Sequence, residues 1–181
     1  MELHEAFIAA TVDAFEANRK LADRAIAQLL DEQLRTSLDS NTNSIAVIMK
    51  HVAGNLLSRW TDFLTTDGEK PNRNRDEEFV DSFTNRQEIL DRWNQGFACA
   101  LNSIRGLSAD DLQKSVAIRG EPHTVPLAIQ RSLGHTCYHV GQIVQVARIL
   151  AGDKWTTLTI ARGQSQQFNQ SNWGTGGKPR S

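Results

Sequence analysis

The sequence predicts an all-α fold, a four-helix bundle, because three observations agree. Apolar residues recur with the period of an amphipathic helix along four long segments. No run of alternating apolar and polar residues is long enough to build a sheet. The 181 residues, of which 39% are hydrophobic, suffice for one domain with a sizeable core. Four helices of this length bury their apolar faces most simply as a bundle.

The first predicted helix covers residues 3–34 and carries one apolar stripe. The stripe comprises Ile8, Val12, Phe15, Ala22, Ile26 and Leu29. The second predicted helix begins after the polar cluster at residues 39–43, which supplies N-cap candidates, and continues to about residue 65. Residues 66–76 contain Asp67-Gly68, Pro71 and alternating charges, a composition that predicts a loop.

The third predicted helix covers residues 81–106, and a short segment of different character precedes the fourth. Within residues 115–125, two apolar runs flank Gly120-Glu121-Pro122, which predicts a small hairpin or an ordered loop. Pro122 argues against a regular two-residue hairpin turn. Pro126 suits the first turn of the fourth helix, which ends near Gly152.

We expect one bundle domain over residues 1–162 and a C-terminal tail over residues 163–181. The tail is rich in Gln, Asn, Ser and Gly, a composition typical of a flexible segment. Phe168 and Trp173 are the side chains that would dock it on the bundle or on a partner.

Composition excludes several functional classes. With 20 basic and 21 acidic residues the net charge is −1, so we expect no nucleic-acid partner. No apolar run is long enough for a transmembrane helix, and the acidic N-terminal residues Glu2 and Glu5 do not fit a signal peptide. Two cysteines are too few for a disulfide framework and indicate a reducing compartment. We therefore expect a cytoplasmic protein that does not bind membranes.

Three histidines form the candidate metal site. His135 and His139 are four residues apart, so they project from nearly the same side of a helix. His51, in the second predicted helix, can supply a third ligand. Three protein ligands leave coordination positions open, as in catalytic metal sites. Cys137 lies about 200° around the helix from His135, so we expect it in the core or at an interface rather than on the metal.

The pattern resembles the DinB-like superfamily of metal-binding four-helix bundles, which includes the YfiT-like proteins and bacterial thiol S-transferases. In that superfamily one ligand histidine lies on the second helix and an H-x-x-x-H pair on the fourth, and His51, His135 and His139 match these positions. The likeness is greatest to an uncharacterised branch. It rests on five segments, MKHVAGN (49–55), SRWTDF (58–63), DGEKP (67–71), IRGE (118–121) and YHVGQI (138–143). The resemblance implies an up-down-down-up topology and, commonly, a homodimer.

Two residues of the second predicted helix are candidates for binding a substrate. Arg59 follows His51 by eight residues, close to the same helical face, and is a candidate catalytic residue or a clamp for an anionic group. A salt bridge with Asp62 is the alternative. Asn55 is placed to bond a metal-bound water or a substrate, or else to bond backbone groups.

Further candidates lie around the fourth predicted helix. Glu121 and His123 are candidates for a proton shuttle or for supporting a ligand, and Arg119 and Gln142 for binding a substrate. His123 as a fourth metal ligand is a weaker alternative. The structural alternative for residues 119–123 is a charged turn.

The first functional hypothesis is a metal-dependent enzyme acting on a small molecule. A divalent ion lowers the pKa of a bound water from 15.7 toward about 7, and ionises a bound thiol. An S-transferase using a low-molecular-weight thiol and a hydrolase are both open. The expected metal is zinc or nickel, with iron or manganese as alternatives. The second hypothesis is a non-catalytic, metal-stabilised binding or stress-response module.

Overall fold

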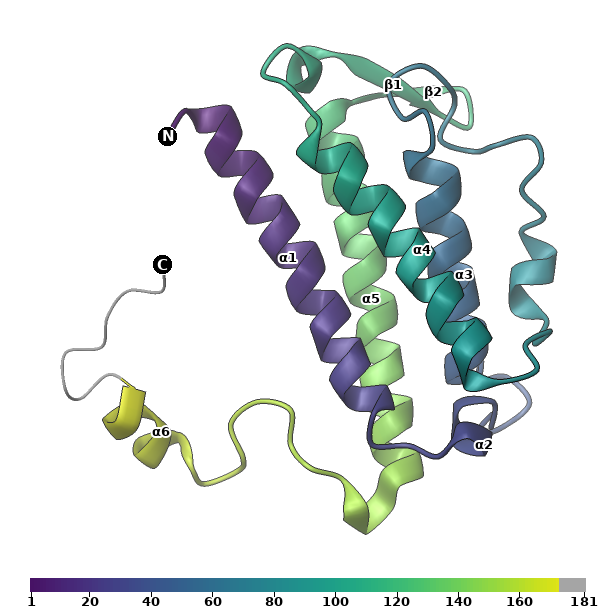
Figure 1. The fold of residues 1–181 in the computed structure, drawn as a ribbon, viewed down its shortest axis with the longest axis vertical. Helices are drawn as coiled ribbons and strands as arrows, with labels where there is room; N and C mark the ends of the chain where they lie inside the picture. Colours follow the sequence, from purple (N-terminus) through teal and green to yellow (C-terminus); the bar gives the residue numbers. More distant parts are fainter. Residues whose placement is uncertain (173–181) are drawn as a thin grey trace.

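A computed structural model describes residues 1–172 and shows a mostly helical protein (Figure 1). Four helices are long, namely α1 (Leu3–Ile26), α3 (Ile45–Trp60), α4 (Arg86–Arg105) and α5 (Val125–Ala151). The other elements are short, namely α2 (Asp31–Leu34), α6 (Ser165–Asn172), η1 (Asp76–Phe79), η2 (Asp111–Gln113), η3 (Gly152–Lys154), β1 (Ser115–Ile118) and β2 (Glu121–Thr124). The predicted helical class is therefore confirmed, with one small antiparallel sheet added.

The long helices enclose the core. Helices α1 and α3 each pack against both α4 and α5. In Figure 1, α1 and α5 run in one direction while α3 and α4 run in the other. Fully buried aromatic side chains, Phe15, Trp60, Trp93 and Phe97, fill the space between them. Of the helices in the described part of the chain, none combines the length and apolar character needed to cross a membrane.

The first predicted helix is wrong at its C-terminal end, because α1 ends at Ile26 rather than near residue 34. The backbone turns away and is extended at Leu30, with φ −74° and ψ 162°, before the short helix α2 begins. The guanidinium of Arg86, in the first turn of α4, donates hydrogen bonds to the carbonyl oxygens of Ile26 and Leu29. The carbonyl of Ile26 also accepts a hydrogen bond from the amide of Leu29, so Arg86 joins the end of α1 and the turn after it to α4.

Helix α3 is shorter than predicted at both ends. It begins after Ser44, whose hydroxyl accepts a hydrogen bond from the amide of Val47 at 3.3 Å, rather than after residues 39–43. It ends at Trp60, and Asp62 then adopts a left-handed φ of 46° that a helix does not allow. Phe63 is nevertheless buried, at 5% exposure, so the apolar pattern continues past the true end of the helix.

Replacing Ser44 by alanine tests this N-cap. The change removes the acceptor for the Val47 amide, so we expect the free energy of unfolding to fall by about 1 kcal/mol. Urea unfolding followed by circular dichroism measures it. Ser115→Ala, at an exposed strand position, is the control and stays within about 0.5 kcal/mol of the wild type. Equal stability of both variants would contradict the assignment of the cap.

Helix α4 begins at Arg86, five residues later than predicted. The side chain of Asn85 accepts a hydrogen bond from the amide of Glu88 at 3.0 Å and caps it. The connection from α3 to α4 is accordingly longer than the predicted loop at residues 66–76, and it contains η1. It runs the full length of the helices (Figure 1), as two neighbouring helices with the same direction require.

The predicted hairpin is present, but its turn is Arg119-Gly120 rather than Gly120-Glu121-Pro122. Both turn residues have positive φ, 57° and 76°, as a tight two-residue turn requires. The carboxylate of Asp67 accepts hydrogen bonds from both turn amides at 2.8 and 2.7 Å. Pro122 is tolerated because its strand partner, Ala117, directs its carbonyl to the amide of Gly68 instead.

Helix α5 agrees with the prediction. The hydroxyl of Thr124 caps its start, Pro126 lies in the first turn, and Gly152 ends it with φ 55°. After η3 the chain reaches α6, where Phe168 is 36% exposed. Trp173 and the remainder of the predicted tail lie outside the described residues.

Candidate metal centre

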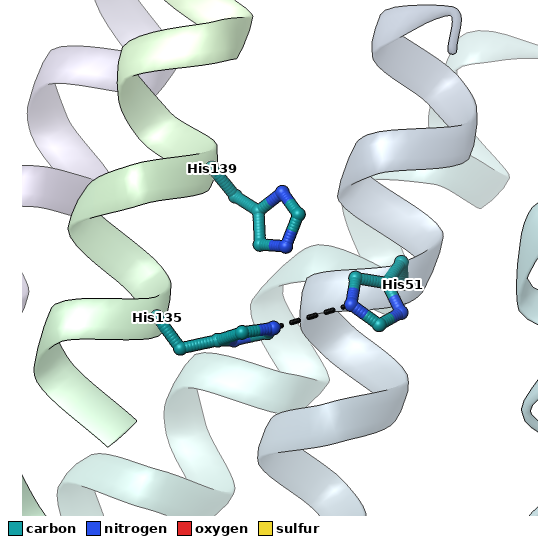
Figure 2. A group of neighbouring side chains, drawn as sticks. All are labelled: His51, His135 and His139. Atoms are coloured by element: carbon teal, nitrogen blue, oxygen red, sulfur yellow. Dashed lines mark hydrogen bonds between the residues drawn. The ribbon is translucent and has the colours of Figure 1, made fainter. Parts of the chain in front are cut away.

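The packing of α3 against α5 brings the three predicted histidines together. His135 and His139 project from α5 toward His51 on α3 (Figure 2). One potential ligand atom from each residue lies within 4.8 Å of the other two. The Nε2 atoms of His51 and His135 are 3.2 Å apart. Two nitrogens that bind one tetrahedral zinc at 2.0–2.1 Å are about 3.3 Å apart, so the group fits a divalent ion.

Hydrogen bonds orient two of the imidazoles. The Nδ1 of His51 is 2.9 Å from a carboxylate oxygen of Glu78, and the Nδ1 of His139 is 2.7 Å from the amide oxygen of Gln142. Both oxygens are acceptors, so each Nδ1 carries the proton and each Nε2 keeps a free electron pair. The buried Nδ1 of His135 has no hydrogen-bond partner within residues 1–172.

Burial keeps the imidazoles of His135 and His139 neutral. Burial is the largest cause, and together with the proximity of His139 and His51 it lowers the pKa of His135 to about 3. Burial also lowers the pKa of His139, although the hydrogen bond with Gln142 opposes the shift. Neutral imidazole is the form that binds metal ions, so both groups are available as ligands at neutral pH.

Glu78, on η1, supports the site and was not predicted from the sequence. It is 7% exposed and accepts hydrogen bonds from His51 and from the Nε and Nη2 atoms of Arg73, at 2.8 and 2.7 Å. Burial raises the pKa of Glu78, but the hydrogen bonds from His51 and Arg73 outweigh it, so that pKa lies below its ordinary value. Glu78 is therefore the carboxylate that fixes the His51 ring.

A glycine in α3 makes room for Glu78. A Cβ atom on Gly54 would lie 2.3 Å from the Oε1 atom of Glu78, which no real structure tolerates. Gly54 is three residues after His51, on a neighbouring part of the same face. A glycine inside a helix lowers stability, so its presence there usually has a structural reason. Gly54 is therefore the sequence signal for the close approach of another side chain to α3 at this point.

Three of the predicted substrate-binding residues lie beside the metal centre. Asn55, Arg59 and Arg119 line a cavity of about 210 Å³ that is also lined by His51 and His135. Arg59 is 7% exposed, and no salt bridge joins it to Asp62 in the described part of the chain. Their role in binding a substrate stays a prediction.

The other predicted residues lie elsewhere. Gln142 orients His139 and does not line the cavity. Glu121 is exposed on β2, and His123 lies outside the group of three histidines. The Nε2 of His123 accepts a hydrogen bond from Arg131 at 2.9 Å. Cys137 is exposed on α5, so of its two predicted places the core is wrong, and the interface stays a prediction.

Sequence reasoning also missed three arginines at the cavity. Arg73, Arg75 and Arg131 contribute to its wall. Arg131 had a signal, because it precedes His135 by four residues and thus shares its side of α5. Arg73 and Arg75 had none, because they lie in an irregular, charged connection whose path the sequence does not indicate.

The fold and the site define a class: a helical protein with a candidate three-histidine metal centre between two of its long helices. A family model described as "Protein of unknown function (DUF1572)" matches residues 2–164, so the chain belongs to the DUF1572 family. No curated protein matches the chain.

Proposed function

We propose that the protein is a DinB-like, up-down-down-up four-helix bundle that acts as a metal-dependent enzyme on a small molecule. The opposite directions of α1 and α5 on one side and α3 and α4 on the other support the topology. The observation that carries the function is the convergence of His51, His135 and His139, of which His51 and His135 also line a cavity. A purely structural ion has no need of a cavity beside it.

The residues present suit zinc or nickel, with iron or manganese as alternatives, because imidazole nitrogen binds all of these metals. The ion would supply an activated nucleophile at neutral pH, from water or from a low-molecular-weight thiol. His51, His135 and His139 would hold it. Glu78 orients His51, Gln142 orients His139, and Asn55 is placed at the cavity wall to donate or accept a hydrogen bond.

Turnover by metal-free and metal-loaded protein tests the proposal. We would assay transfer of cysteine to an aromatic electrophile and hydrolysis of phenyl esters, with the His135→Ala variant as the control for background chemistry. Activity that requires both the metal and His135 is expected in one of these assays. Metal-loaded protein that does not exceed His135→Ala in either assay would favour the second candidate function.

That second candidate is a non-catalytic, metal-stabilised binding or stress-response module. It is favoured by the long separation of the ligands, since His51 and His135 are 84 residues apart. An ion that joins two such distant positions closes a long loop and stabilises the folded state. A rise in melting temperature with metal, without turnover, is its signature. A cytoplasmic homodimer is part of the proposal under either function.

A further inference from the structure

Five arginines line the cavity next to the metal centre. They are Arg59, Arg73, Arg75, Arg119 and Arg131, and the cavity has a volume of about 210 Å³. Its wall also includes His51 and His135, so a molecule in the cavity reaches the two histidines whose Nε2 atoms face each other.

Only part of this positive charge is neutralised. Arg73 forms salt bridges with Glu69 and Glu78, at 3.1 and 2.7 Å, and Arg119 shares Glu69 at 3.3 Å. Two carboxylates thus face five guanidinium groups, which leaves three positive charges uncompensated.

The three uncompensated arginines have no carboxylate partner within residues 1–172. Arg131 donates a hydrogen bond to the Nε2 atom of His123 at 2.9 Å. The guanidinium of Arg75 lies 5.1 Å from the centre of the Phe79 ring. Arg59 has neither kind of contact. All three guanidinium groups therefore line the cavity without a carboxylate from the described residues that neutralises their positive charge.

Arg59 is the most unusual of the three. It is 7% exposed, and its buried Nη1 atom has no hydrogen-bond partner in the described residues. Burial lowers the pKa of Arg59 and the nearby charge of Arg131 lowers it further, although the charge of Glu69 opposes the shift. A buried charge that bonds no carboxylate is costly, so Arg59 calls for an anion from outside the chain.

The absence of a side chain at Gly68 makes room for the guanidinium group of Arg59. A Cβ atom on Gly68 would lie 2.9 Å from the Nη1 atom of Arg59 and 3.0 Å from its Cδ. The neighbouring Asp67 caps the β1–β2 turn and thereby fixes the position of Arg119. The glycine and the capped turn together hold two arginines at one wall of the cavity.

We propose that this cavity binds a dianionic group of the substrate, a phosphate or a pair of carboxylates, and presents the rest of the molecule to the three histidines. Planar guanidinium groups bind such oxyanions through paired hydrogen bonds. The claim that the bound anion is part of a substrate rests on the proposed function. The claim that the arginines bind an anion is independent of the proposed function.

Calorimetric titration of metal-free protein with inorganic phosphate and, separately, with succinate tests the inference. We expect at least one of them to bind, and its identity distinguishes a phosphate from a pair of carboxylates. Arg59→Gln and Arg131→Gln each weaken that binding about 10- to 100-fold. Arg131 is exposed, so its variant gives a readout even if Arg59→Gln fails to fold. Arg92→Gln, outside the cavity, leaves affinity unchanged.

Absence of binding by either anion to folded, metal-free protein would overturn the inference. So would affinities that are equal in the wild type, Arg59→Gln and Arg131→Gln. Metal titration of the same samples separates the two proposals. Loss of anion binding with intact metal binding leaves the proposed function standing. Anion binding by a protein that takes up no metal leaves the arginine site standing instead.

Discussion

Alanine in place of His51, His135 or His139 is expected to reduce affinity for a divalent metal by roughly 100-fold. Zinc sites with four ligands are worth about 10–16 kcal/mol, so each ligand contributes roughly 3 kcal/mol. The three imidazoles converge within 4.8 Å, and no other group of three or more histidine, cysteine or acidic residues within residues 1–172 is placed to hold an ion. A variant that lacks one imidazole therefore has no nearby replacement.

Elemental analysis of protein purified without a metal-binding tag measures the stoichiometry, and competition with a chelating dye measures the affinity. Cys137→Ala is the matched control, because Cys137 lies between His135 and His139 on α5 but is exposed. It is expected to bind metal like the wild type. Full occupancy in all three histidine variants would show that the metal is bound elsewhere in the protein.

The sequence predicts the convergence of the three histidines well because its geometry is local or repeated. The spacing of His135 and His139 alone places both on one side of α5. His51 reaches this pair when α3 packs against α5 with its His51 side facing the pair, as it does in the structure. The apolar periodicity of the two helices and the family resemblance both predict this packing. The four long helices are predicted for the same reason, since their apolar stripes extend over many turns.

The ends of the helices are less predictable, because contacts made far along the chain determine them. Helix α1 ends at Ile26, whose carbonyl accepts a hydrogen bond from Arg86, 60 residues away in sequence. The apolar stripe continues through Leu29 and Leu34, which are buried although the helix is broken between them. Apolar periodicity indicates which residues are buried, and residues in a turn between two helices can be buried as well. The pattern alone therefore does not show where a helix ends.

The environment of the ligands is the least predictable part of the site. Glu78 belongs to the acidic run Asp76-Glu77-Glu78, which by composition resembles a solvated loop. Only the path of the connection between α3 and α4 brings this one carboxylate to His51 while Glu77 stays exposed. The five arginines of the cavity come from α3, the same connection, the hairpin turn and α5, so no spacing rule joins them.

Replacing Glu78 by glutamine is expected to weaken metal binding about 10- to 100-fold, the usual effect of removing a carboxylate that orients a metal-bound histidine. The neutral amide is a poorer acceptor for the Nδ1 proton of His51, so the ring loses orientation and basicity. Within residues 1–172 the variant leaves Arg73 with Glu69 as its only carboxylate partner, and therefore stability is expected to fall as well. Metal affinity must be measured at a temperature where the metal-free variant is folded. Glu77→Gln, which changes an exposed carboxylate one residue away, is the matched control.

Gly54→Ala separates orientation of His51 from loss of charge. It keeps every ionisable group, but its Cβ atom occupies the space of the Glu78 carboxylate and must displace it. If the hydrogen bond between His51 and Glu78 strengthens metal binding, Gly54→Ala and Glu78→Gln weaken metal binding by similar factors. Only Glu78→Gln alters the net charge. Wild-type affinity in Gly54→Ala together with weak binding in Glu78→Gln would instead mean that Glu78 acts through its charge. Wild-type affinity in both would leave Glu78 as a partner of Arg73 and no part of the metal centre.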